Sequence, residues 1–587
     1  RDMLKKFFIS MLGAMAGFWL TLILFGIGLI VFVTMLISNM SGGVKLAKEN
    51  ILYINLEGNI PERQEEIGLN MLLNLEDGTP ETLCDILTAI RAAATDPSIK
   101  GIYIDCKGSS LGVASRSEIV EALDEFKSSG KFVIAYSDTY DQGDYYVATA
   151  ADQVYLNPVG NIDVHGLVSS IMFYKGLMDK LDIEAQVVKV GDFKSAVEPF
   201  IRTEMSEENK LQTSIFLNQI WKNITTTIAK NRSVDTTAVN MWADSICGTW
   251  ATEQYVSDKM ADATKYRSEV ENLLRDKLSL KEDEELPLVK PSEYLSSNSM
   301  PKLTKDKHIA VYYAVGDIVD DGKGGIVGNV VVSDILDLAK DDNVKGLILR
   351  VNSGGGSAFA SEQIWHALEE FKATGKPFYV SMGDYAASGG YYISCGADKI
   401  YADASTLTGS IGIFGLLFNG EKLIKEKAGI NIDNVATNKN SVFPSLYQAA
   451  TPDMMEALQR TVNRGYETFT SRVAEGRKIS VDSVKVIGGG RVWDGETALS
   501  IGLVDEIGSL NKVLNDMAQN LDLSAEDYQC YPSKKEIWEE LLSGNNASID
   551  ISALGDEAMM AYKASMAIKM IKSLSPVQAR MEPITIE

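Results

Sequence analysis

Histidine and cysteine are scarce in this chain of 587 residues, and their scarcity excludes several kinds of active site. The three histidines are His165, His308 and His366, and no HExxH motif is present. A zinc hydrolase of the HExxH type is therefore excluded, and a Ser-His-Asp triad would have to use one of these three residues. The five cysteines are odd in number and show no CxxC spacing, which argues against a zinc site or a disulfide framework. We expect no metal and no cofactor.

Basic residues are also in deficit, because 56 Lys and Arg face 80 Asp and Glu and the net charge is −24. Nucleic acids are bound by basic surfaces, so we expect no nucleic-acid partner. Hydrophobic residues make up 45% of the chain and charged residues 23%, which is typical of globular proteins. The length allows several domains.

One segment near the N-terminus has no charged residue at all, from Phe7 to Val44. Its apolar part is longer than the apolar region of a cleaved signal peptide, and at about 1.5 Å per residue it would span the roughly 30 Å hydrocarbon core of a bilayer. We therefore predict a cytoplasmic tail at 1–6 and a transmembrane signal anchor at 7–38 that contacts lipid. Arg1, Lys5 and Lys6 favour a cytoplasmic N-terminus. The protein would then be a single-pass protein of the cytoplasmic (inner) membrane with the bulk of its chain on the periplasmic side.

The chain contains an internal repeat. Residues 100–131 resemble residues 345–376 at an offset of 245, and residues 138–167 resemble 384–413 at an offset of 246. Each copy contains a short β run, a Gly/Ser loop and an amphipathic helix, which is typical of an α/β fold with parallel strands and helical crossovers. We expect the following parts after the anchor: a first repeat at 45–285, a proline-containing linker at 286–305, a second repeat at 306–520, and a C-terminal extension of unknown role at 521–587.

Two loops of the second repeat are candidates for catalysis. The sequence NSGGGS (352–357) contains three consecutive glycines, which can point backbone N–H groups at a ligand or can form an ordinary turn. Ser388 stands between two alanines and two glycines at the expected start of a helix. It could expose its hydroxyl as a nucleophile beside the N–H of Gly389, or it could cap the helix.

The duplication helps to decide between these interpretations. The first copy has Gln142 in place of Ser388 and Ser-Ser-Leu in place of the three glycines, so it has lost both features together. This pattern indicates that the second copy holds a nucleophile site that the first has lost. A desolvated lysine can act as the base for a serine nucleophile. The candidate is Lys194 in the first copy, which aligns with Asn440, next to Lys439. A solvated surface charge is the alternative interpretation of Lys194.

Five motifs identify a family resemblance: GDFKSAVEPF, VNSGGGS, MGDYAASGGYYIS, STLTGSIGIFG and GRVWDGETALSIGLVDEIG. The sequence resembles the signal peptide peptidase A family in its long, tandem-domain, membrane-anchored bacterial form. The resemblance implies tandem β-α superhelical domains of the Clp protease and crotonase superfamily and a serine peptidase with a Ser/Lys dyad. By motif, Ser388 matches the nucleophile, Lys194 the general base and Ser410 the serine that orients the lysine. The loops that supply oxyanion N–H groups match Gly355, Gly356 and Gly389.

The resemblance implies a membrane-anchored serine endopeptidase that degrades released signal peptides and similar apolar peptides, assembled as a homotetramer. One departure is Gly354, where the family commonly has proline. Two alternatives stay open: a general quality-control protease of the cell envelope and a catalytically silent peptide-binding scaffold in the membrane. An acyl-CoA enzyme of the crotonase type shares the fold, but the predicted anchor argues against it.

Overall fold

The computed structural model describes seven continuous segments and isolated positions between 13 and 28: residues 46–63, 81–281, 283–297, 307–322, 324–441, 445–532 and 577–581. Nearly all of the predicted anchor at 7–38, and the whole tail at 1–6, lie outside the described residues. In the described part of the chain, no helix combines the length and apolar character that crossing a membrane requires. The anchor therefore stays a prediction.

The first repeat folds around a six-stranded parallel sheet with the order β6-β4-β3-β2-β1-β7. Its β-branched and aromatic runs, such as IYID in β2, are the kind that favour strands. The strands are β1 (Asn50–Gly58), β2 (Ile99–Ser109), β3 (Phe132–Ser137), β4 (Gln153–Leu156), β6 (Ala263–Thr264) and β7 (Leu288–Val289).

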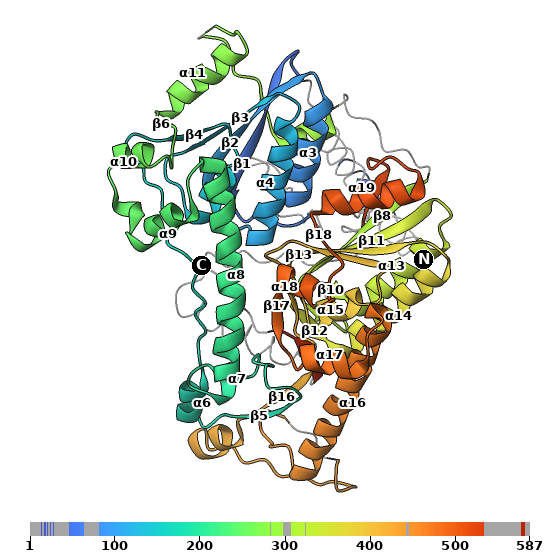
Figure 1. Cartoon of the computed structure of the whole chain (residues 1–587). Coiled ribbons are helices and arrows are strands. Elements are labelled where there is room, and N and C mark those ends of the chain that lie inside the picture. The colour runs from blue at the N-terminus through green and yellow to red at the C-terminus, as the bar shows by residue number, and fades with distance from the viewer. Residues whose placement is uncertain are drawn as a thin grey trace, which may run out of the picture.

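Helices cover both faces of this first sheet (Figure 1). Helix α3 shows why: its buried Ile86, Ile90 and Ala93 recur at helical spacing, and Thr82 caps its N-terminus by accepting a hydrogen bond from the N–H of Asp85. The helices of this unit are α3 (Leu83–Thr95), α4 (Val113–Lys127), α5 (Gln142–Ala148), α8 (Glu207–Arg232), α9 (Thr236–Asp244), α10 (Thr252–Ser257), α11 (Arg267–Lys277) and α12 (Pro291–Ser296).

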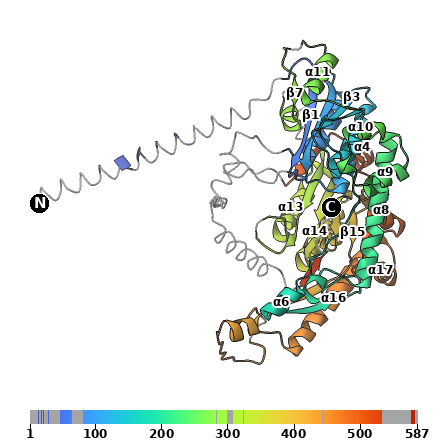
Figure 2. The same ribbon diagram turned by 90° about the vertical axis from the view of Figure 1, so that its left-hand side faces the viewer.

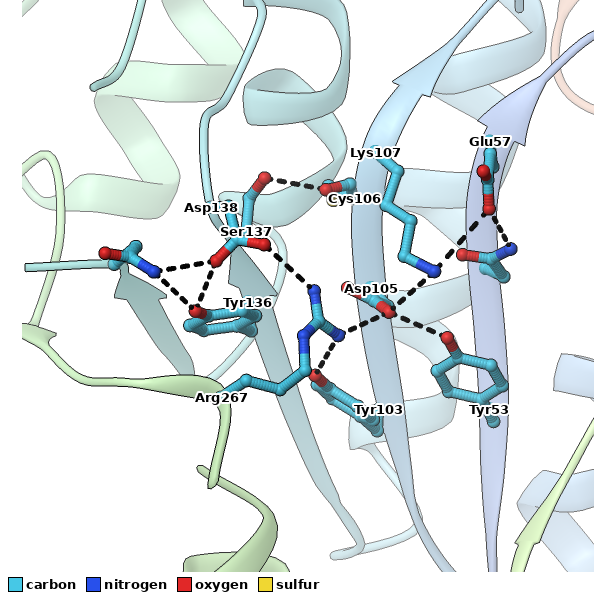
Figure 3. Close-up of polar contacts among 12 residues, drawn as sticks. Tyr53, Glu57, Tyr103, Asp105, Cys106, Lys107, Tyr136, Ser137, Asp138 and Arg267 are labelled. Atoms are coloured by element: carbon cyan, nitrogen blue, oxygen red, sulfur yellow. Dashed lines mark hydrogen bonds and ion pairs between the residues drawn. The ribbon is translucent and has the colours of Figure 1, made fainter. Parts of the chain in front are cut away.

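A cluster of polar side chains connects α11 to the first sheet (Figure 3). The carboxylate of Asp105 on β2 is fully buried, and it accepts hydrogen bonds of 2.7 Å from the Tyr53 hydroxyl and from Nη1 of Arg267, the first residue of α11. Burial and the hydrogen bond to Asp105 raise the pKa of Tyr53. The hydroxyl and the guanidinium thus compensate the buried negative charge.

The second repeat builds a sheet in which the path β18-β14-β13-β11-β8-β19 repeats the strand order of the first sheet. It adds β15 and β17 beside β13. The strands are β8 (His308–Val315), β11 (Val344–Ser353), β13 (Phe378–Ala387), β14 (Lys399–Ala402), β15 (Leu407–Gly409), β17 (Val492–Asp494), β18 (Glu506–Ile507) and β19 (Tyr528–Tyr531). The helices are α13 (Gly328–Lys340), α14 (Ala358–Ala373), α15 (Gly389–Ser394), α16 (Pro452–Arg477), α17 (Val481–Ile487), α18 (Gly495–Ser500) and α19 (Leu510–Leu521).

Two of the expected boundaries differ from the structure. The expected linker at 286–305 contains β7, which pairs with β1, and α12, which packs on α3. The expected extension at 521–587 contains β19, which pairs with β8 at the equivalent edge of the second sheet. Both strands are short edge strands, and their pairing partners lie more than 200 residues earlier in the chain. Local sequence pattern therefore gives little indication of them.

A third, mixed sheet joins the two repeats, with the order β10-β9-β12-β20-β16-β5. Its β5 comes from the first repeat and runs antiparallel to β16 of the second. The chain crosses to the second unit through α6 (Lys175–Leu181) and α7 (Glu198–Ile201), and α8 then runs alongside both units (Figures 1 and 2). The strands are β5 (Glu184–Lys189), β9 (Ile318–Val319), β10 (Ile326–Val327), β12 (Gly355–Ser357), β16 (Phe414–Asn419) and β20 (Val577–Arg580).

A buried ion cluster also links the repeats. Arg350 on β11 is 1% exposed and donates to Glu62 at 3.0 Å and to Glu118 on α4 at 2.6 Å. Burial raises the pKa of Glu118 to about 7, although the Arg350 guanidinium favours its charged form. The cluster thereby connects the first repeat to β11, the strand that leads into the glycine loop.

Replacing Arg350 with leucine is expected to destabilise the protein by about 3–5 kcal/mol, because two buried carboxylates lose their cation. Urea denaturation followed by circular dichroism would measure the loss as a lower unfolding midpoint. The matched control is Arg460→Leu, which removes the exposed ion pair with Glu456 on α16. Equal midpoint shifts in the two variants would contradict a stabilising role for the buried cluster.

Candidate active site

Ser388 lies at the turn between β13 and α15, in a backbone conformation that is unusual for a serine. Its φ of 54° and ψ of −111° place it outside the common regions for residues other than glycine. Its N–H donates to the carbonyl of Gly409 at 2.7 Å, and its carbonyl accepts from the N–H of Tyr392 at 2.8 Å. Strained conformations of this kind cluster at functional sites. The turn holds the hydroxyl at a fixed position.

Lys194 comes from the first repeat, in the segment between β5 and α7, and reaches Ser388 in the same chain. Its Nζ lies 2.9 Å from Ser388 Oγ, and the two residues are 1% and 0% exposed. Burial disfavours the charged ammonium form of a lysine, which is the form that cannot accept a proton. Gly490 allows the close approach, because it has a φ of 82° and a Cβ on it would lie 2.6–2.7 Å from Lys194.

Ser410 completes a group of three side chains. Its Oγ lies 3.0 Å from Lys194 Nζ, and its carbonyl oxygen accepts from the same Nζ at 3.3 Å. The Ser410 hydroxyl donates to the carbonyl of Gly490 at 3.2 Å. Ser410 is 1% exposed and has a φ of 50°. These contacts fix the position of the amine opposite the Ser388 hydroxyl.

The glycine loop lies against the start of α15. Gly355 has a φ of 102°, and a Cβ on it would lie 2.7 Å from the amide nitrogen of Gly389. The two segments that were predicted to supply oxyanion N–H groups are therefore adjacent. Gly356 continues into β12, where it pairs with Ile318 of β9.

Substituting Gly355 with alanine is expected to lower kcat by on the order of 10²–10³-fold, the typical effect of losing one oxyanion donor, because the added Cβ forces the two loops apart. The matched control is Gly354→Ala, since a Cβ at Gly354 would meet no heavy atom within 4 Å. Steady-state kinetics on one peptide would compare the two variants. If both variants lose activity equally, the loop has another role.

The first repeat shows what replaced the nucleophile there. Gln142 occupies the equivalent position, and its Oε1 accepts from the N–H groups of His165 and Gly166 at 2.9 and 2.8 Å. Val164 stands where the second repeat has Ser410. A pocket of about 230 Å³ remains, lined by Arg116, Gln142 and His165 among others. The first repeat therefore has neither the hydroxyl nor the serine that would orient a lysine.

Two other candidate residues lie outside the site. His366 is on α14, 65% exposed and 3.1 Å from Glu370, which fits a surface residue. Lys439, next to the position aligned with Lys194, is 80% exposed and pairs with Asp453. One further neighbour of the site was not predicted from the sequence: the strand β20, which contacts both glycine segments.

Comparison with known proteins identifies the family. A family model described as Peptidase family S49 matches residues 125–281 and 370–524. A protein named "Protease 4" from Haemophilus influenzae is 33% identical over 599 residues, which cover 95% of this chain and 93% of that protein. The "Serine protease SPPA, chloroplastic" of Arabidopsis thaliana is 30% identical and covers 72% of this chain and 63% of that protein. The chain therefore belongs to peptidase family S49 and is a serine peptidase.

The two matched segments lie one in each repeat, which confirms the tandem organisation. Among solved structures, a point mutant of ClpP1 from Listeria monocytogenes aligns with 34% of this chain and 91% of that chain, at 16% identity and a TM-score of 0.24. A score this low supports no statement about the fold. The Clp-type superhelical arrangement stays a prediction.

Proposed function

We propose that this serine peptidase degrades released signal peptides and similar apolar peptides at the outer face of the cytoplasmic membrane, with Ser388 as nucleophile and Lys194 as general base. The observation that carries the proposal is the 2.9 Å separation of Lys194 Nζ and Ser388 Oγ in a buried site. A serine hydroxyl becomes nucleophilic when an adjacent neutral base takes its proton.

The proposed reaction has two steps. Neutral Lys194 takes the Ser388 proton while Oγ attacks the peptide carbonyl, and the oxyanion is bound by N–H groups of the glycine segments. Lys194 then protonates the leaving amine, and water hydrolyses the acyl-enzyme. Ser410 holds the lysine in position through its 3.0 Å contact.

Two features support an apolar substrate and a place at the membrane. Exposed apolar side chains, including Met172 and Leu177, gather at α6 and the loop before it. Here the Tyr174 ring stacks on Phe200, and the Phe200 ring contacts that of Phe418 on β16. The first residue of β16, Phe414, lies beside the Lys194 amine. The charge-free segment at 7–38 is the second feature, because an anchor would keep the enzyme where released signal peptides reside.

The substrate class can be tested by comparing two substrates in detergent. A synthetic apolar signal peptide is expected to give a higher kcat/KM than an unfolded polar protein such as casein, with products followed by mass spectrometry. If casein is the better substrate, the general quality-control role replaces this proposal. Cleavage of neither substrate would favour the silent scaffold.

A further inference from the structure

Two cysteines from different repeats meet at the boundary between them. Cys84 is the second residue of α3 in the first repeat, and Cys530 lies on β19 at the edge of the second sheet. The Cys84 thiol is hydrogen-bonded to the Cys530 thiol, and both thiols interact with the hydroxyl of Tyr313 on β8. Both cysteines are partly buried and pack against one apolar cluster. The two sulfur atoms are therefore neighbours, although the residues are far apart in the chain.

Further contacts hold α3 and β19 side by side. The Thr88 hydroxyl lies 3.1 Å from the Tyr528 hydroxyl. The Arg63 guanidinium donates to the carbonyl oxygens of Pro532 at 2.7 Å and of Cys530 at 3.3 Å. A disulfide forms without strain only between cysteines whose backbones are held at a suitable separation. These contacts fix the two backbones on either side of the sulfur pair.

The other three cysteines have different surroundings. Cys106, Cys247 and Cys395 are buried, and each thiol donates to a backbone carbonyl. Burial raises the pKa of each of these thiols. The hydrogen bond from Cys530 instead lowers the pKa of Cys84 to about 7. Because the thiolate is the form that attacks a disulfide, Cys84 is the most reactive of the five cysteines.

We propose that Cys84 and Cys530 form a disulfide bond between the two repeats by exchange with an organic disulfide. The Cys84 thiolate attacks one sulfur of the donor, the donor S–S bond breaks, and the other donor sulfur leaves and takes up a proton. Cys530 then gives up its proton and attacks the Cys84 sulfur, which releases the second donor sulfur as a thiol. The two protein thiols are oxidised, and the donor is reduced to two thiols. Disulfides persist in the bacterial periplasm, the side of the membrane to which the proposed function assigns both repeats.

The bond would reinforce a contact that leads toward the active site. The N–H of Cys84 donates to the carbonyl of Glu62 at 3.0 Å, and the Glu62 carboxylate accepts from Asn352 at 3.0 Å. Asn352 lies at the end of β11, just before the three glycines. A cross-link that closes a long loop stabilises a protein mainly by constraining its unfolded chain. We therefore expect the oxidised protein to unfold at a higher urea concentration than the reduced protein.

The test treats the purified full-length protein with oxidised glutathione in detergent, blocks free thiols with N-ethylmaleimide and digests the protein without reduction. Mass spectrometry is expected to find the peptide of Cys84 joined to that of Cys530, and Cys84→Ser should abolish this product. The matched control is Cys395→Ser, because a serine keeps the hydrogen bond from this position to the carbonyl of Tyr392. This variant should form the bond as the unaltered protein does.

Unfolding in urea, with and without dithiothreitol, supplies a second readout. The reductant should lower the midpoint of the oxidised unaltered protein and of Cys395→Ser, but not that of Cys84→Ser. The proposal is refuted if N-ethylmaleimide labels both cysteines after the treatment, if glutathione stays attached to Cys84, or if the bond joins two copies of the chain. Neither readout uses the Ser388 hydroxyl, so the proposed function stands or falls separately.

Discussion

Replacing Ser388 with alanine is expected to reduce peptide hydrolysis to background, a fall in kcat on the order of 10⁶-fold by analogy with other serine peptidases. Ser388 is the hydroxyl next to Lys194, and the equivalent position of the first repeat holds Gln142, which cannot replace it. A cleavage assay with a synthetic apolar peptide, followed by mass spectrometry, would measure the loss.

Ser394→Ala is the matched control for this experiment. Ser394 is also buried and lies on α15, but its hydroxyl donates to the carbonyl of Gly390 within the helix. This variant should keep most of the activity. Retained hydrolysis in Ser388→Ala would show that the reaction takes place elsewhere or comes from a contaminant.

Replacing Lys194 with alanine is expected to lower kcat by about 10²–10⁴-fold, the typical contribution of a general base, with a smaller effect on KM. Lys194→Arg should be equally inactive, because a guanidinium does not lose its proton in proteins. The reason lies in the geometry, since Nζ contacts both Ser388 Oγ and Ser410 Oγ in a buried site.

Lys439→Ala controls for the loss of a positive charge, because Lys439 is exposed and outside the site. Its kcat should match that of the unaltered protein. Steady-state kinetics across a pH series would compare all four proteins. If Lys194→Ala stays within a few fold of the unaltered protein, another group must take the Ser388 proton.

Much of the fold could be predicted from the sequence because the duplication makes its units visible. At the offsets of 245 and 246, the matching strands and helices of the first repeat align with their counterparts in the second. The two sheets share one strand order. The helices and longer strands within each unit follow from local periodicity. Edge strands such as β7 and β19 could not be predicted in this way, because distant partners determine whether two to four residues form a strand.

The candidate site was predicted less directly. Ser388 stood out by its small neighbours and by its loss in the first copy, but Lys194 has no local pattern that distinguishes it from a surface lysine. It was a candidate because a serine nucleophile can use a desolvated lysine as its base, and the family resemblance then supported this choice. The structure supplies the physical link, because β5 pairs with β16 and carries the lysine across to the second repeat within one chain. The four residues Val-Gln-Ala-Arg of β20 are too few for their alternation to predict a strand, and their pairing with β12 and β16 determines the register.

The central claim is that one chain builds a single Ser/Lys site from its two repeats. The most direct measurement is the rate at which a serine-directed fluorophosphonate labels the protein, with the modified residue located by mass spectrometry. We predict labelling at Ser388, much slower labelling in Lys194→Ala, and an unchanged rate in Lys439→Ala. Labelling at another serine, or an equal rate in Lys194→Ala, would contradict the claim.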